Sequence, residues 1–221
     1  MLRRFLRPFH PLFYRLIKWY YKKPRSFEKR GIKIKLLPSV FHPSYYLSTD
    51  ILLDYTLSID LEGKNVLELG CGSAFISLFL AKNTGAKCSA SDLNFAAIKG
   101  LSENIKTNKV DIEFFHSDLF EDIPRNDFDI ILINPPYFEQ DPKHDDEIAF
   151  YAGKDLQYFA KLFDQLRSRL TADAFALMIL SENVNSRKIL EVLTRNELLI
   201  SVVHTIKKND ELFLIYRIYT N

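Results

Sequence analysis

The sequence predicts an α/β fold built around a seven-stranded, mostly parallel sheet. From about residue 65 onward, short apolar segments alternate with segments whose apolar residues recur every three or four positions. The run from Asp129 to Ile133 is the clearest buried strand. With 221 residues, of which 47% are hydrophobic, the chain can bury one substantial core, so we expect one main domain.

The alternation gives the order and type of each element. The expected strands cover residues 66–69, 88–91, 112–116, 128–133, 175–180, 199–206 and 211–219. The expected helices cover residues 49–57, with Ser48 or Thr49 as N-cap, and 74–82, 95–107, 155–169 and 186–195. Helical crossovers keep successive strands parallel, whereas the polar turn at residues 207–210 makes the last strand antiparallel.

The amino-terminal region differs from this domain in charge. We expect residues 1–37 to form a basic helical arm and a short strand at 32–37, and residues 38–221 to form the main domain. Twelve basic residues and only Glu28 as an acidic one occur in the first 35 positions, so the remaining chain carries a net charge of −9. The arm could dock on the domain, contact RNA or the ribosome, or bind an anionic membrane surface.

Composition also limits the cellular setting. Cys71 and Cys88 are too few for a disulfide framework or a thiolate metal site, and no apolar run reaches the roughly 18 to 20 residues of a transmembrane helix. Arg7 and Arg15 interrupt any signal-peptide core. We therefore expect a cytoplasmic monomer without a transmembrane segment or a bound metal.

A glycine-containing turn follows the first strand of the alternating region. Glu68 precedes Gly70 and Gly72, which allow the backbone to approach a ligand closely. A nicotinamide-binding fingerprint would need a third glycine where Phe75 stands, so an oxidoreductase is disfavoured. The alternative pattern of an acidic residue followed by Gly-x-Gly-x-Gly is met except at Ala74.

Asp92 ends the next strand. Its carboxylate offers two acceptor oxygens, which suit the two ribose hydroxyls of an adenosine, although Asp92 could also serve as N-cap of the helix at 95–107. The third strand is followed by Asp118 and Leu119, which could equally be part of a solvated loop.

The fourth strand ends in Asn134, Pro135, Pro136 and Tyr137, at the edge where open α/β sheets bind their ligands. A planar amine attacks poorly because its lone pair is delocalised. The Asn134 side-chain oxygen and the Pro135 carbonyl could hold both of its hydrogens, and Tyr137 could stack on it. The alternative is a strand-terminating Pro-Pro turn without chemistry.

In this order, the glycine turn, Asp92, Asp118 and Asn-Pro-Pro-Tyr resemble the NPPY amino-methyltransferases, including HemK-like and small-domain methyltransferases. The resemblance covers about residues 38–220 and implies a Rossmann-like class I methyltransferase fold with S-adenosylmethionine as cofactor. It implies that the glycines contact the methionine part of the cofactor, that Asp118 binds the adenine amino group, and that the Leu119 amide meets a ring nitrogen.

The same resemblance implies N-methylation of a planar NH2 group. The substrate would be a glutamine of a release factor or an exocyclic amine of a ribosomal or transfer RNA base. A non-catalytic RNA-binding module with the same fold is the alternative. The expected catalytic residues are Asn134, Pro135 and Tyr137, and the expected cofactor-binding residues are Glu68, Gly70, Gly72, Asp92, Asp118, Leu119 and Asn134.

Overall fold

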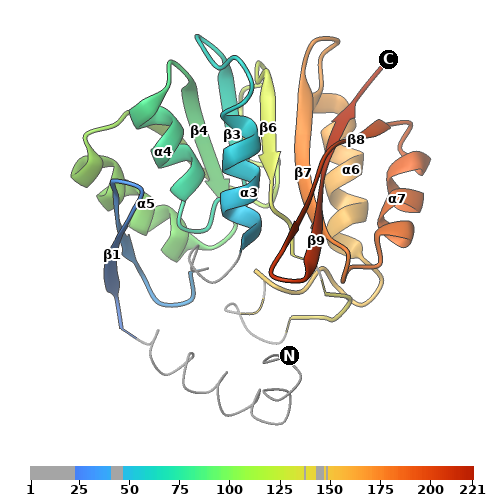
Figure 1. Ribbon diagram of the computed structural model, residues 1–221, viewed down its shortest axis with the longest axis horizontal. Helices are drawn as coiled ribbons and strands as arrows, with labels where there is room; N and C mark the ends of the chain where they lie inside the picture. The colour runs from blue at the N-terminus through green and yellow to red at the C-terminus, as the bar shows by residue number, and fades with distance from the viewer. Residues whose placement is uncertain (1–22, 41–46, 137, 143–146, 148) are drawn as a thin grey trace.

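The computed structural model describes residues 23–40, 47–136, 138–142, 147 and 149–221. The predicted basic helix within residues 1–22 lies outside these ranges, as does Tyr137. Figure 1 shows a twisted sheet flanked by helices, with a separate β-hairpin beside α5. Within the described ranges, no helix combines the length and the apolar character needed to cross a bilayer.

The main sheet has seven strands in the order β5-β4-β3-β6-β7-β9-β8. β9 is antiparallel to both of its neighbours, β7 and β8, and all the other pairings of this sheet are parallel, so the predicted sheet and its antiparallel last strand are confirmed. The strands are β3 (Asn65–Leu69), β4 (Lys87–Asp92), β5 (Ile112–His116), β6 (Ile130–Ile133), β7 (Phe175–Ser181), β8 (Leu199–Lys208) and β9 (Glu211–Tyr219).

Two hydrophobic clusters fill the two sides of this sheet. One cluster contains buried residues of the first three helices, and the other contains those of the last two. The helices are α3 (Leu47–Thr56), α4 (Phe75–Asn83), α5 (Phe95–Asn108), α6 (Gln157–Arg169) and α7 (Ser186–Arg195). This three-layer arrangement is the expected way to bury both faces of a parallel sheet.

Three predicted helix starts were wrong by one or two residues, because α3 begins at Leu47, α4 at Phe75 and α6 at Gln157. Ser48 and Thr49 lie inside the first turn of α3, so neither is its N-cap. Ala74 precedes α4 as its N-cap and has a left-handed backbone, with φ 53°. Its amide donates to the Cys71 carbonyl at 2.7 Å, so Ala74 still belongs to the glycine turn.

The predicted strand at 32–37 is one half of a hairpin. β1 (Arg25–Lys29) pairs antiparallel with β2 (Ile32–Leu36) across Arg30 and Gly31, which both have positive φ, as in a type I′ turn. β1 was not predicted, because its partly buried positions 25, 27 and 29 hold one apolar residue, Phe27, between two basic ones. In β2 the apolar residues are fully buried and the lysines are exposed.

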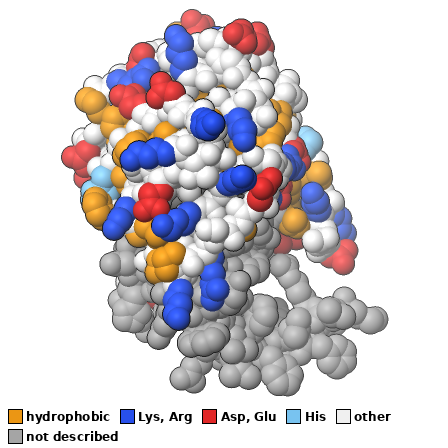
Figure 2. All heavy atoms as spheres, turned by 90° about the vertical axis from the view of Figure 1, so that its left-hand side faces the viewer, with side chains coloured by type: hydrophobic (Ala, Val, Ile, Leu, Met, Phe, Trp, Pro, Cys, Tyr) orange, Lys and Arg blue, Asp and Glu red, His pale blue; other side chains and the backbone are white. Residues whose placement is uncertain are grey.

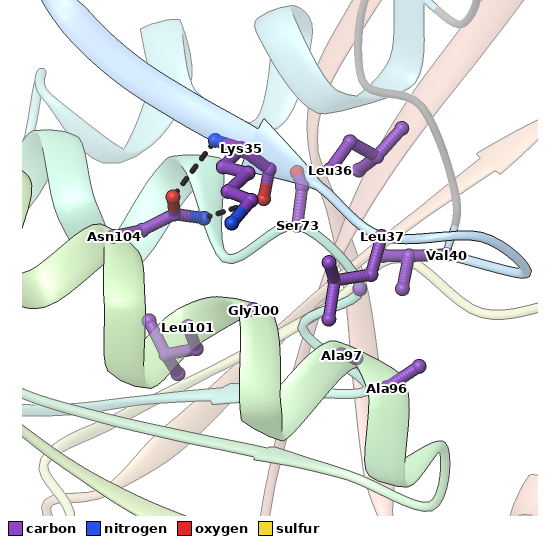
Figure 3. A pocket seen from close by; sticks show the side chains of 11 residues that line it. Lys35, Leu36, Leu37, Val40, Ser73, Ala96, Ala97, Gly100, Leu101 and Asn104 are labelled. Carbon is purple, nitrogen blue, oxygen red and sulfur yellow. Dashed lines mark hydrogen bonds between the residues drawn. The ribbon is translucent and has the colours of Figure 1, made fainter. Parts of the chain in front are cut away.

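Two asparagines of α5 hold β2 by its main chain. Asn104 accepts from the Lys35 amide at 2.8 Å and donates to the Lys35 carbonyl at 3.2 Å. Asn108 makes the same pair of bonds with Lys33, at 2.9 and 2.7 Å. Figure 3 shows the Asn104 amide facing Lys35. These four bonds fix the hairpin against the main domain.

A narrow crevice lies beside this contact, between the end of β2 and α5. Leu37 and Val40 line it from one side, and Gly72 and Ala97 from the other. It has no room for a ligand, so it is a packing seam. It brings the segment after β2 against the glycine turn.

Asn104→Ala is expected to destabilise the protein by about 1–3 kcal/mol, because it leaves the Lys35 amide and carbonyl without their partner. Asn83→Ala is the matched control, since Asn83 is exposed near the end of α4 and its side chain contacts only its own helix. Urea unfolding measures the loss, and hydrogen exchange at the Lys35 amide should accelerate. Equal losses for both variants would contradict the role of Asn104.

Candidate active site

The candidate site lies where β3, β4 and β6 end. β3 pairs with β4 on one side and with β6 on the other, and Leu69 is in register with both Ser91 and Ile133. The next residues, Gly70, Asp92 and Asn134, therefore leave neighbouring strand ends. This is the switch point of an open α/β sheet, where ligands bind.

The glycine turn has the conformation that its sequence predicts. Gly70 and Gly72 have φ values of 70° and 52°, in the left-handed region where glycine is favoured. A Cβ atom added to Gly70 would meet no atom within 4 Å. The Cys71 amide donates to the Ser91 carbonyl at 2.9 Å, which ties the turn to β4. The turn therefore has open space beside its backbone.

Asp92 organises the junction of the two strand ends. Its Oδ2 accepts from the Gly72 amide at 2.7 Å, and its Oδ1 accepts from the Asn94 amide at 2.8 Å. Burial raises the pKa of Asp92, and these two bonds partly counter that effect. The alternative role as N-cap of α5 was wrong, because Asn94 caps that helix by accepting from the Ala96 amide at 2.9 Å.

Glu68 is only 8% exposed, and its carboxylate is hydrogen-bonded to the first turn of α4. Its Oε2 accepts from the Ser77 amide at 2.8 Å and from the Ser77 hydroxyl at 2.6 Å. The N-cap, Ala74, has no side-chain cap bond, so Glu68 satisfies a first-turn amide from the neighbouring strand. Burial raises the pKa of Glu68 to about 7 although the Ser77 bonds lower it, and Asp92 raises it further.

The loop that carries Asp118 and Leu119 is bonded to the end of β4 through Ser117, the residue before Asp118. The Ser117 amide donates to the Asp92 carbonyl at 3.0 Å. Leu119 is buried and has a left-handed φ of 56°. The Asp118 carboxylate contacts Lys161 of α6, a residue that the sequence analysis did not single out. The structure thus brings the predicted adenosine-binding loops together.

Asn134 contacts α3. Its Nδ2 donates to the Thr49 hydroxyl at 3.3 Å, and Thr49 is almost fully buried. Pro135, the next residue, is buried as well. From the sequence, Thr49 was predicted only as a helix cap, since no local pattern connects two residues 85 positions apart. Tyr137, the third predicted catalytic residue, lies outside the described residues.

A short bridge continues the chain beyond position 137. Phe138 pairs with Tyr151; the Phe138 amide donates to the Phe150 carbonyl at 3.0 Å, and the Ala152 amide donates to the Phe138 carbonyl at 2.8 Å. The rings of Phe138 and Tyr151 meet edge to face, with centroids 6.5 Å apart. Phe138 is 52% exposed, so an aromatic surface stands four residues after Asn134. In the sequence, the position of Phe138 soon after Pro135 and Pro136 was the feature from which this aromatic surface could have been predicted.

Glu68→Gln is expected to flatten the pH dependence of folding stability. The native carboxyl, with a pKa of about 7, keeps its proton up to a higher pH than an ordinary glutamate at 4.5. The stabilising contribution is complete below about pH 4.5 and is lost as the pH rises through 7, by roughly 3 kcal/mol. Urea unfolding of both proteins between about pH 5 and pH 8 measures it. A difference between them that is constant with pH would speak against a shifted carboxyl.

The donor and acceptor set fits S-adenosylmethionine. Open space beside Gly70 admits a ligand close to the backbone, and each Asp92 oxygen retains a lone pair for a ribose hydroxyl after its backbone bond. Among the described residues, no three His, Cys, Asp or Glu side chains gather as a metal site.

Solved structures of methyltransferases share the fold. A chain of the E. cuniculi Mtq2–Trm112 complex, described as responsible for methylating the eRF1 translation termination factor, has a TM-score of 0.60 and 20% identity, over 83% of this chain and 99% of that one. The T. thermophilus 16S rRNA N2 G1207 methyltransferase RsmC, in complex with AdoMet (S-adenosylmethionine) and guanosine, has a TM-score of 0.61 and 19% identity, over 90% of this chain and 50% of that one.

Sequence comparison gives a narrower grouping. A Methanocaldococcus jannaschii protein, provisionally named a protein N5-glutamine methyltransferase, is 45% identical over 94 residues, which are 42% of this chain and 46% of that protein. This chain thus spans about half the length of that curated relative. The Methyltransferase small domain profile matches residues 31–196, well over half of the chain. S-adenosylmethionine is accordingly the cofactor, and the chain belongs to the Methyltransferase small domain family.

Proposed function

We propose that this chain transfers a methyl group from S-adenosylmethionine to the side-chain amide nitrogen of a glutamine in a translation protein. The observation that carries the proposal is the position of Asn134 at a strand end adjoining the glycine turn, with its amide nitrogen bonded to Thr49. The relative with 45% identity supports glutamine as the target, because its provisional name gives that chemistry.

The Thr49 contact gives Asn134 an orientation. An amide group that donates through its nitrogen on one side presents its oxygen on the other. That oxygen is the acceptor that a planar NH2 group needs. Pro135 adds a carbonyl whose direction is restricted by Pro136. Tyr137 keeps its predicted role as a stacking surface, and the exposed ring of Phe138 supports a target site rich in aromatic residues.

Two acceptors on one NH2 group fix the plane of the target and direct its lone pair. The bound cofactor supplies an electrophilic methyl group. Alignment then provides much of the rate enhancement, so no strong base is required next to Asn134. The target nitrogen can release its proton after the transfer.

We assign the cofactor contacts as expected from the sequence, with two exceptions. Asn134 is assigned to the target amine alone, and Glu68 is assigned a supporting part. Gly70 and Gly72 would hold the methionine portion, Asp92 the ribose, and Asp118 with the Leu119 amide the adenine. The two bonds of Glu68 go to Ser77, so we propose that Glu68 shapes the turn through α4.

An RNA base is the second candidate target, favoured by a basic surface. Figure 2 views the molecule from the side of β1 and α5 and shows Lys and Arg side chains spread across that face, with Asp and Glu side chains among them. The hydrogen bond from Lys35 lowers the pKa of Glu103 on α5. The charges of Lys99 and Lys106, on the same helix, lower it further. Such a surface suits a phosphate backbone.

We retain three further expectations as proposals. The chain acts as a monomer, resides in the cytoplasm, and uses the basic residues before β1 to contact RNA or the ribosome. The charge of that segment, with seven basic residues and no acidic one among the first 24, supports the last of them.

Asp92→Ala is expected to weaken cofactor binding by about tenfold or more, because it removes both acceptors for the ribose and releases the Gly72 and Asn94 amides. Isothermal calorimetry with S-adenosylhomocysteine measures the affinity. Asp129→Ala is a control, since Asp129 stands at the opposite end of the parallel strands, where it contacts the Asn65 amide at 2.7 Å. Unchanged affinity in Asp92→Ala would remove it from the site.

The substrate class is tested by transfer of a tritiated methyl group from S-adenosylmethionine to fractionated cell extract, with the protein and the RNA digested separately. Label that is recovered as N5-methylglutamine supports the proposal. Label in the RNA fraction would support the second candidate, and label in neither fraction would favour a non-catalytic RNA-binding module.

Asn134→Ala in the same assay is expected to reduce transfer at least 100-fold while the cofactor affinity changes less than about threefold, because only the target amine loses its acceptor. Asn126→Ala is the matched control, because Asn126 is exposed and contacts only the Ser168 carbonyl. Equal loss of binding and transfer in Asn134→Ala would show that its role was misassigned.

A further inference from the structure

One side of α6 holds the loop that carries Asp118. Lys161, Gln165 and Arg169 recur at four-residue intervals, so they lie on one face of the helix. Gln165 Oε1 accepts from the Phe120 amide at 2.9 Å. Arg169 and Lys161 reach the same loop from the same face of α6.

Arg169 fixes the main chain of this loop. Its guanidinium donates to the carbonyls of Phe120, Ile123 and Arg125 at 2.8, 3.0 and 3.0 Å, and it stands 5.4 Å from the centroid of the Phe120 ring. A planar group with five donors can satisfy several carbonyls at once. The loop is thus held in one conformation without a helix of its own.

Lys161 acts on the loop's side chains. Its ammonium contacts Asp118 Oδ2 at 2.5 Å and Glu121 Oε1 at 2.7 Å. Burial lowers the pKa of Lys161, but the bonds to Asp118 and Glu121 raise it by more. The cation therefore offsets the repulsion between two neighbouring carboxylates and holds one oxygen of Asp118.

Tyr158, one turn before Lys161, is a further residue of α6 on which the charges of the predicted adenosine site act. Its ring packs against the hydrophobic core, with the Phe159 ring 5.3 Å away. Burial raises the pKa of the Tyr158 hydroxyl, and the charges of Asp92 and Asp118 raise it further. Both carboxylates assigned to the adenosine are thus near one side chain of α6.

We propose that Lys161 is a positioning residue that aims Asp118 at the 6-amino group of adenine and so makes the site select adenosine over its deaminated counterpart. The proposal rests on the assignment of Asp118 under the proposed function. With Oδ2 held by Lys161, Oδ1 faces the ligand as an acceptor. A 6-amino group donates to it, whereas the 6-oxo group of hypoxanthine presents lone pairs and is repelled.

The test compares the affinities of S-adenosylhomocysteine and S-inosylhomocysteine by calorimetry. The unchanged protein is expected to prefer the adenosine ligand by about tenfold or more. Lys161→Met should reduce that preference to less than about threefold, because Asp118 loses its restraint, and Lys161→Arg should retain it. The ratio of the two affinities reports the positioning of Asp118, since a general loss of stability weakens the binding of both ligands alike.

Lys64→Met is the matched control. Lys64 pairs with Asp129 at 3.6 Å, which is another lysine–aspartate contact but lies before the strands begin. The control should keep the full preference. Lys161→Gln gives a second measurement if the methionine variant does not fold, which circular dichroism establishes.

Full preference in folded Lys161→Met and Lys161→Gln would overturn the inference. So would an unchanged protein that binds both ligands equally, although the proposed function would then survive, because cofactor binding and methyl transfer remain. Failure of the unchanged protein to bind S-adenosylhomocysteine would instead contradict the proposed function.

Discussion

The hydrogen bond from the Gly72 amide to Asp92 is the contact on which the site depends. It joins the turn after β3 to the end of β4, so two peptide segments twenty residues apart form one rigid wall. The Cys71 amide donates to the Ser91 carbonyl, and the Ser117 amide donates to the Asp92 carbonyl, so the end of β4 is bonded to the segments on both sides of it. A ligand meets backbone that is already arranged, which lowers the ordering cost of binding.

The segment after β6 connects Asn134 to α6, the helix that contacts the loop carrying Asp118. The chain passes from Asn134 through the Phe138–Tyr151 bridge directly into α6, and α6 then holds the loop after β5. Asn134 also reaches α3 through Thr49. The loop after β5 is thus bonded to α6, and Asn134 is bonded to α3.

The sequence could predict what local patterns determine. The order of strands, the glycine turn and the position of Asn134 follow from periodicity and spacing, and the structure confirms the sheet. The Thr49 and Lys161 contacts could not be predicted, because they join residues 85 and 43 positions apart. β1 was not predicted for a related reason. Its partly buried face is mostly charged, and its partner strand, β2, is bonded to asparagines that are distant in the sequence.

Those asparagines give α5 the function of a neighbouring strand. Residues four apart on a helix are separated by about 6 Å along its axis, and alternate residues of a strand by roughly 6.7 Å, so two amide groups can match two peptide units. The free edge of β2 is thereby covered and cannot recruit a strand from another molecule. Because the asparagines recognise only peptide groups, position 33 is free to change in charge and size, whereas Lys35 also pairs its ammonium with Glu103 at 2.7 Å. This face of the protein can therefore adapt to a new partner at position 33 without losing the four main-chain bonds.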